Sequence, residues 1–317
     1  MRILVTGGAG FIGSHLVGRL REVGHTVSIL DDLDDMYAPS LKRANLALIG
    51  MECSPHFHYG DIRDSAAVES AVNIERPEVI VHLAARAGVR PSLVLPLLYE
   101  QVNVGGTVNV LEAARRRGVA KVVFASSSSV YGVSNAVPFS EEDPVSLPVS
   151  PYAATKLAGE HMCFTWSHLY GLSTICLRFF TVYGPRQRPD LAIRKFTELI
   201  DRGERVYMFG DGSTSRDYTH VDDTVAGVVA AIRYESKFDV FNIGNSSPIT
   251  LSSLLGLIEE NLGRKALIER VPEQRGDVPC TYADITKAKR LLRYDPQIPL
   301  TQGIAQFVRW YKTGCLQ

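Results

Sequence analysis

Short apolar runs alternate with amphipathic stretches through the first half of the chain. The runs are too short for helices and rich in strand formers, whereas apolar residues between them recur at helical spacing. We expect strands at 3–5, 26–30, 57–60, 78–83, 120–125 and 173–180, and helices after residue 10 and at 39–50, 64–73, 96–118 and 151–170. This alternation predicts an α/β fold with a doubly wound parallel sheet, which binds ligands beyond the carboxyl ends of its strands.

The segment 6–13, TGGAGFIG, joins the first expected strand to the first expected helix. In that setting Gly7 suits a tight turn, Gly10 lets the backbone approach a ligand, and Gly13 lets the helix pack close to the strand. The N-terminus of the helix then directs N–H groups and the positive end of its dipole toward the turn, where a pyrophosphate can bind. This context favours a Rossmann-type dinucleotide site over a glycine-rich turn without a ligand.

The second expected strand, 26–30, leads directly into Asp31. Its position, about 20 residues beyond the glycines, is where a carboxylate binds the adenosine ribose of a dinucleotide. Asp32 adds a second negative charge, and no Arg or Lys follows directly. Because two carboxylates repel a ribose 2′-phosphate, we predict NAD rather than NADP as the cofactor.

The pattern changes after residue 180. A loop-like stretch at 183–189 precedes an expected helix at 193–202 and a turn at 209–213, and no second glycine motif follows. We therefore predict that residues 1–180 form the NAD-binding Rossmann-type domain and also receive about 219–245. Residues 181–317 would form mainly a smaller C-terminal α/β substrate lobe that is interleaved with it.

Composition excludes several classes of protein. The 317 residues are 45% hydrophobic, which is ample for a large core, and the formal net charge of zero predicts neither a nucleic-acid partner nor an anionic membrane surface. No apolar run approaches the ~18 residues of a membrane span, and the first strand leaves no room for a signal peptide. The five cysteines, at 53, 163, 176, 280 and 315, lack CxxC spacing. We expect reduced thiols, no metal site and a cytoplasmic protein.

The expected helix 151–170 carries Tyr152 and Lys156 four residues apart, on one face, behind Ser150 as a natural cap. A free phenol has a pKa of about 10, and a neighbouring ammonium group lowers it toward the value that a general base needs. In isolation, such a pair is more often a half-buried Tyr beside a solvated Lys.

Together these motifs resemble the extended short-chain dehydrogenase/reductase family over essentially the whole chain. The resemblance is carried by TGGAGFIG at 6–13, Asp31, Asp61-Ile62, HLAA at 82–85, the serine run 126–129 before Val130-Tyr131-Gly132, and the Tyr152/Lys156 pair. It implies that Tyr152 is the catalytic acid/base, that Lys156 holds the nicotinamide ribose and tunes Tyr152, and that Ser127 hydrogen-bonds the reacting hydroxyl. The implied NAD-binding residues are Gly7, Gly10, Phe11, Ile12, Gly13, Asp31, Asp61, Ile62, Leu83, Ala84, Ala85, Asn103, Tyr152 and Lys156.

Within that family the chain is most similar to the nucleotide-sugar epimerases, and among them to UDP-glucuronate 4-epimerases. The stretches 86–92, 183–190 and 209–218 carry this likeness. The implied substrate-binding residues are Arg90, Ser128, Thr181, Arg188, Arg216 and Asp277. Of these, Arg216 would bind the UDP diphosphate, Asp277 a ribose, and Thr181 with Arg188 the C6 carboxylate; the last two could equally be ordinary loop residues.

The resemblance implies NAD-dependent interconversion of UDP-glucuronate and UDP-galacturonate through a 4-keto intermediate. Related dehydratases and decarboxylases carry an acid within the serine run, and residues 126–129 contain none. The alternatives are a UDP-glucose/UDP-galactose 4-epimerase, a UDP-glucuronate decarboxylase and a catalytically silent NAD-binding sensor. Family resemblance also implies a homodimer through the helices at 96–118 and 151–170.

Overall fold

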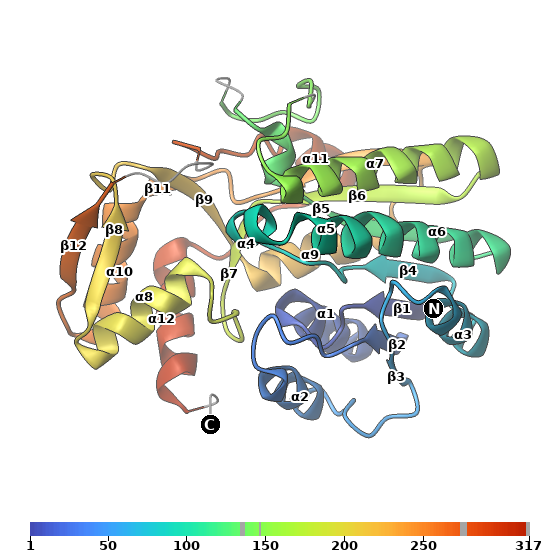
Figure 1. Cartoon of the computed structure of the whole chain (residues 1–317), viewed down its shortest axis with the longest axis horizontal. Coiled ribbons are helices and arrows are strands. Elements are labelled where there is room, and N and C mark those ends of the chain that lie inside the picture. Colours follow the sequence, from blue (N-terminus) through green and yellow to red (C-terminus); the bar gives the residue numbers. More distant parts are fainter. Residues whose placement is uncertain (134–136, 146, 273–277, 315–317) are drawn as a thin grey trace.

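The structure is a computed structural model that describes residues 1–133, 137–145, 147–272 and 278–314. Within these ranges a sheet of seven parallel strands has the order β10-β6-β5-β4-β1-β2-β3 (Figure 1). The strands are β1 (Arg2–Thr6), β2 (Thr26–Asp31), β3 (Phe57–Tyr59), β4 (Val79–His82), β5 (Lys121–Ser127), β6 (Ser173–Phe179) and β10 (Phe238–Ile243). From β1 the chain first proceeds outward to β2 and β3 on one side and then crosses to β4, β5 and β6 on the other. A crevice is therefore expected between the carboxyl ends of β1 and β4.

Helices cover both faces of this sheet. One face packs against α1 (Phe11–Glu22), α9 (Val221–Arg233) and α11 (Thr286–Leu292), with α2 (Pro39–Leu48) beside α1. The other face packs against α3 (Ser65–Glu75), α6 (Gly106–Arg116) and α7 (Pro151–Tyr170). Buried aliphatic residues fill both layers, because strands covered on two sides must be apolar throughout. The predicted fold class is confirmed.

A second lobe lies to the side of the main sheet (Figure 1). Its strands are β7 (Thr181–Tyr183), β8 (Arg205–Phe209), β9 (Ser215–His220), β11 (Pro248–Thr250) and β12 (Leu267–Val271). Its helices are α8 (Ala192–Arg202), α10 (Leu251–Leu262) and α12 (Leu300–Lys312). A separate hydrophobic cluster holds these elements together and includes Ile193, Val206, Leu254 and Phe307.

The chain crosses between the two parts more than once. After α8, β8 and β9 it returns to the main sheet, where β10 pairs in parallel with β6, from Phe238 opposite Thr174 to Ile243 opposite Phe179. Residues within the 219–245 stretch thus belong to the large sheet. The division into an NAD-binding part and a substrate lobe remains a prediction about function.

The helix expected at 96–118 is not uniform, and this expectation was wrong in detail. It is composed of α5 (Pro96–Glu100), the π-helical turn η1 (Gln101–Gly105) and α6. The wider turn contains Asn103, and the side-chain amide of Asn103 forms hydrogen bonds with Arg86 and Thr155. A short helix, α4 (Val89–Val94), precedes α5, and a 3₁₀ turn, η2 (Ser128–Tyr131), follows β5. By contrast, α7 begins as expected, with the Ser150 hydroxyl accepting from the Ala153 N–H.

Candidate functional site

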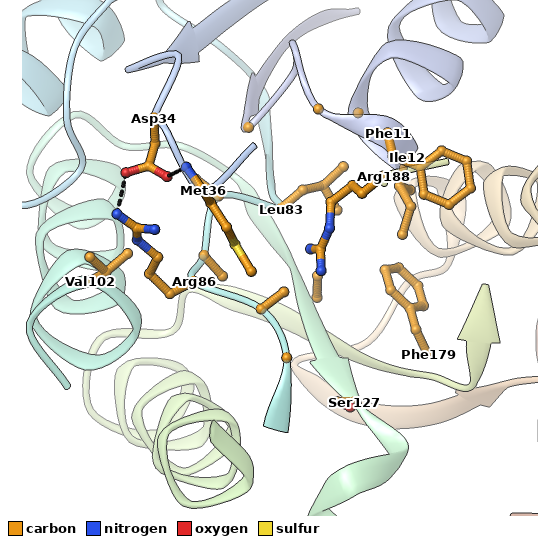
Figure 2. A pocket seen from close by; sticks show the side chains of 18 of the residues that line it. Phe11, Ile12, Asp34, Met36, Leu83, Arg86, Val102, Ser127, Phe179 and Arg188 are labelled. Atoms are coloured by element: carbon orange, nitrogen blue, oxygen red, sulfur yellow. Dashed lines mark hydrogen bonds and ion pairs between the residues drawn. The ribbon is translucent and has the colours of Figure 1, made fainter. Parts of the chain in front are cut away.

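A cavity of about 380 Å³ opens at the carboxyl ends of the central strands (Figure 2). It lies where the strand order reverses, between β1 and β4, and its size is typical of a ligand site. The predicted residues that line it are Gly7, Gly10, Phe11, Ile12, Gly13, Asp31, Asp61, Ile62, Leu83, Ala84, Ala85, Ser127, Ser128, Tyr152, Lys156, Thr181 and Arg188. Residues far apart in sequence are thus brought to one space, as their positions after strand ends predicted.

The glycine turn has the geometry that a dinucleotide requires. Gly7 has φ +73°, and a Cβ there would lie 2.8 Å from the Ala84 nitrogen. A Cβ on Gly13 would collide with the Gly7 carbonyl oxygen. Among the described residues, no side chain caps the start of α1, so its first-turn N–H groups remain available at the cavity wall. This end of the cavity fits the pyrophosphate of NAD.

The carboxylate of Asp31 is fixed beside this turn. It is buried and accepts hydrogen bonds from the N–H groups of Ala9 and Leu33, both at 2.9 Å. Burial raises the pKa of Asp31, and the neighbouring Lys42 charge opposes that shift. Burial likewise raises the pKa of Asp32. A carboxylate held at the end of β2 fits the adenosine ribose hydroxyls.

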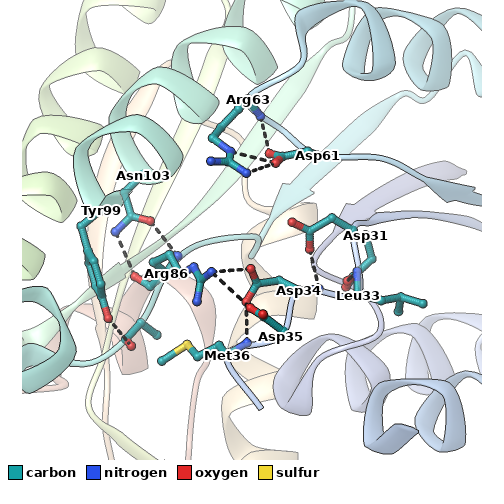
Figure 3. A network of polar contacts seen from close by, with 12 residues as sticks. Asp31, Leu33, Asp34, Asp35, Met36, Asp61, Arg63, Arg86, Tyr99 and Asn103 are labelled. Atoms are coloured by element: carbon teal, nitrogen blue, oxygen red, sulfur yellow. Dashed lines mark hydrogen bonds and ion pairs between the residues drawn. The ribbon is translucent and has the colours of Figure 1, made fainter. Parts of the chain in front are cut away.

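Asp61, after β3, faces the same end of the cavity. Its carboxylate accepts from Arg63 Nε at 2.8 Å and from Nη2 at 2.5 Å (Figure 3). Burial acts to raise the pKa of Asp61, but these hydrogen bonds prevail and the pKa is lowered. Asp61 therefore remains an acceptor at neutral pH.

Tyr152 and Ser127 lie together deeper in the cavity. Burial raises the pKa of Tyr152, and a hydrogen-bonding contact with Ser127 and the positive charge of Arg188 offset only part of this rise. Burial also lowers the pKa of Lys156 to about 8. The Lys156 ammonium donates to the Ala125 carbonyl at 2.7 Å. The tuning of Tyr152 by Lys156 stays a prediction, and Arg188 is a further cation whose charge acts to lower the pKa of Tyr152.

Arg188 extends into the cavity between Leu83 and Phe179 (Figure 2). Asp190 orients it through bonds of 3.0 Å to Nε and 2.7 Å to Nη2, and the Arg188 side chain is only 15% exposed. Burial acts to lower the pKa of Arg188, but the bonds to Asp190 prevail and raise it. A guanidinium held in place beside Tyr152 can donate hydrogen bonds to a carboxylate of a ligand.

Within the described ranges, three predicted residues lie outside this lining. Asn103 bonds instead to the backbone of Arg86 and to Thr155. Arg90 places its guanidinium 5.1 Å from the centre of the Phe209 ring, which links α4 to the second lobe. Arg216 donates to the carbonyl of Ser215 at 2.8 Å. Asp277 lies outside the described residues. No group of three or more His, Cys, Asp or Glu side chains in the described parts is arranged to hold a metal.

Sequence reasoning missed part of the lining. Asp34, Met36, Tyr37 and Lys42 come from the segment after β2, and Arg86 from the loop after β4. Asp34 and Arg86 form an ion pair of 2.5 Å (Figure 3). Asp34 and Arg86 each stand close to a motif that sequence analysis singled out, but their pairing depends on the arrangement of β2 and β4 in the sheet.

A parallel sheet in this order, with a glycine turn and a carboxylate at the end of β2, defines a Rossmann-type dinucleotide-binding protein. The chain belongs to the NAD dependent epimerase/dehydratase family, whose model matches residues 3–244. UDP-glucuronate 4-epimerase 4 of Arabidopsis thaliana is 43% identical, over 98% of this chain and 75% of the relative.

Two solved structures are similar over 99% of both chains. One is UDP-glucuronic acid 4-epimerase from Bacillus cereus with UDP-glucuronic acid and NAD, at a TM-score of 0.91 and 33% identity. The other is UDP-glucose 4-epimerase from Thermotoga maritima with UDP-glucose, at a TM-score of 0.91 and 35% identity. The fold therefore accommodates both uronate and neutral hexose substrates, and the side chains of the site must decide between them.

None of the helices in the described ranges combines the length and the apolar character needed to cross a bilayer.

Proposed function

We propose that this protein is an NAD-dependent 4-epimerase that interconverts UDP-glucuronate and UDP-galacturonate through a 4-keto intermediate. The observation that carries the proposal is the convergence of Tyr152, Ser127 and Arg188 in a cavity that also contains the dinucleotide-binding turn. Similarity to UDP-glucuronate 4-epimerases over 98% of the chain supports it. The nicotinamide ring, when bound, would accept the hydride from C4 and later return it.

Tyr152 would hold the proton that the sugar 4-hydroxyl loses. Burial raises the pKa of Tyr152 overall, and the contact with Ser127 and the charge of Arg188 act in the opposite direction, toward the phenolate. Ser127 would orient the hydroxyl, and Lys156 would bind the nicotinamide ribose. Since the proton returns to the opposite epimer, Tyr152 ends each turnover as it began, and no net redox change occurs.

Arg188, Thr181 and Ser128 would bind the C6 carboxylate. A 4-keto uronate is a β-keto acid, which loses CO₂ when its carboxylate bond aligns with the ketone π-system. Arg188 is held by Asp190 and is largely buried, so a carboxylate bound to it has little freedom to rotate. Binding of the carboxylate in this way would suppress decarboxylation and leave epimerisation as the main reaction.

The UDP group would lie toward the second lobe. Arg216 is on β9, and Arg90 reaches the same lobe through its contact with Phe209. We propose Arg216 as the diphosphate contact and Asp277 as a ribose contact. Arg90 then contributes by joining the two parts around the nucleotide.

The decisive experiment is incubation of the purified protein with UDP-glucuronate, without added NAD, followed by separation of the products. We expect UDP-galacturonate, with almost no UDP-pentose, because NAD stays bound and is regenerated. Predominant UDP-pentose and CO₂ would identify a decarboxylase. In a parallel incubation, turnover of UDP-glucose but not of UDP-glucuronate would identify a neutral-hexose epimerase, and no turnover of either sugar would contradict catalysis.

We further propose that the protein is a cytoplasmic homodimer. The neighbouring helices α4, α5 and α7 expose apolar side chains, including Leu93 and Val94 on α4, Leu97 on α5 and Phe164 on α7. Pairing of such faces would remove them from water. Light scattering after size-exclusion chromatography should give twice the mass of one chain, and a monomer would contradict this assembly.

A further inference from the structure

We propose that Arg86 and Asp34 form a clasp that joins two loops across the dinucleotide site and slows the release of NAD. The inference rests on the proposed function in one respect only, namely that the protein binds NAD. It assigns retention of the cofactor to an ion pair rather than to a residue that contacts NAD directly.

The two partners come from opposite sides of the crevice. Asp34 belongs to the loop after β2, and Arg86 to the loop after β4, on the other side of β1. Arg86 Nη2 lies 2.5 Å from Asp34 Oδ2, and both residues line the cavity (Figures 2 and 3). The side chains are 16% and 24% exposed, so the pair is partly shielded from water and salt.

Arg86 is anchored from the helical side of the site. Its N–H donates to Asn103 Oδ1 at 2.8 Å, and its carbonyl accepts from Asn103 Nδ2 at 3.0 Å. Asn103 Nδ2 also donates to the Thr155 hydroxyl at 3.0 Å, on the helix that carries Tyr152 and Lys156. The π-helical turn η1 thus fixes the Arg86 loop to the helix with the catalytic pair.

Asp34 is anchored from the ribose-binding side. Its second oxygen, Oδ1, accepts from the Met36 N–H at 2.8 Å, and its own N–H donates to Asp32 Oδ1 at 2.9 Å. The adjacent Leu33 N–H donates to Asp31. Hydrogen bonds therefore connect the carboxylate that fits the adenosine ribose, through the Asp34–Arg86 pair, to α7.

A dinucleotide bound on the glycine turn lies in the cavity that these two loops line. Opening either loop separates the guanidinium from the carboxylate while both are partly desolvated, which raises the barrier to release. Asp34 binds the Arg86 guanidinium, whereas the first-turn N–H groups of α1, which no side chain of the described ranges caps, would supply the phosphate site. We therefore assign Arg86 a positioning role that acts through Asp34.

The test measures NADH release from R86A, D34N, the double variant R86A/D34N and wild-type protein. Bound NADH is displaced by excess NAD in a stopped-flow instrument, and the decay of its fluorescence gives the rate. Asp35→Asn is the matched control, because Asp35 is 89% exposed and its carboxylate lies 3.8 Å from Arg86 Nη2. We expect each single variant and the double variant to release NADH about tenfold faster, corresponding to about 1.4 kcal/mol. D35N should stay within about twofold of wild type.

The non-additive pattern is what identifies the clasp. Faster release from R86A with unchanged or slower release from D34N would mean that Arg86 binds the cofactor itself, which overturns the proposal. Additive effects in the double variant, or unchanged rates throughout, also overturn it. Thermal melts verify folding, and D34N reports on the same pair should R86A fail to fold. Since no sugar is present, a wrong assignment of the sugar substrate would leave these rates unaffected.

Discussion

Glu160 and Arg178 form a buried ion pair directly beside the serine run. Arg178 Nε and Nη2 donate to the two carboxylate oxygens of Glu160 at 2.9 and 2.8 Å, and the side chains are only 4% and 5% exposed. The Ser126 hydroxyl donates to the same carboxylate. The pair therefore ties α7 to β6 and to the end of β5, immediately before Ser127.

We predict that Glu160→Gln lowers the free energy of unfolding by about 3–5 kcal/mol, because it leaves the Arg178 charge buried without its counterion. Urea denaturation measures this. Glu22→Gln, in the exposed Arg19–Glu22 pair, is the control and should cost less than about 1 kcal/mol. Equal losses for the two variants would contradict this account of burial.

The loss of stability at acid pH, which is the acid limb of a plot of the free energy of unfolding against pH, should depend on His82. This side chain is buried between the hydroxyls of Thr6 and Thr107, and burial, with the Lys156 charge, lowers its pKa to about 3. Between pH 6.5 and 3 the unfolded chain binds a proton at His82 that the folded protein does not. Stability is therefore complete above pH 6.5 and is lost as the pH falls toward 3, by about 3–5 kcal/mol in total.

His82→Gln should flatten this limb when urea midpoints are compared between pH 7 and pH 4. The control variant is His161→Gln, at an exposed side chain of α7, and it should leave the limb as in wild type. An unchanged limb in His82→Gln would show that other groups cause the acid loss.

Two glycines of α1 should respond oppositely to substitution by alanine. Gly13→Ala places a methyl group against the Gly7 carbonyl and should destabilise by about 2–3 kcal/mol. It should also reduce NAD copurifying with the protein. At Gly18 the nearest atom would be 3.7 Å away, so Gly18→Ala should stabilise by about 0.5–1 kcal/mol. Thermal melts and NAD content distinguish the two, and a tolerated Gly13→Ala would exclude close packing as the reason for glycine.

Tyr152→Phe should reduce kcat for UDP-glucuronate by about 10²–10⁴-fold, since it removes the group that accepts the proton. Tyr99→Phe is a matched control, because the two rings are neighbours at 6.2 Å and the Tyr99 hydroxyl donates to the Ala87 carbonyl. We expect its kcat within about twofold of wild type. Substantial turnover by Tyr152→Phe would refute the mechanism.

Much of the fold could be predicted because its signals are local. Apolar runs located β1 to β6 but none of the strands after residue 180, and Ser150 with Pro151 marked the start of α7 at the observed residue. The π-helical turn could not be predicted in this way, because its sequence, QVNVG, fits an ordinary helix and its Asn103 contacts lie on distant segments.

The same distinction applies to the site. The motifs at 6–13, Asp31 and Tyr152/Lys156 could be proposed from the sequence because the residues of each lie within one short stretch of chain at a typical spacing. The influence of Arg188 on Tyr152 and the Arg86–Asp34 pair depend on how loops from separate strands meet. Such relationships arise only when the sheet is assembled.

The pairing of β10 with β6 has a consequence for biosynthesis. About sixty residues separate the end of β6 at Phe179 from the end of β10 at Ile243. At a ribosomal rate of about 5–20 residues per second, the outer backbone of β6 stays unpaired for roughly 3–12 s after it emerges. A nascent chain stalled in that interval presents an open, apolar strand edge, which is a substrate for chaperones and a seed for aggregation.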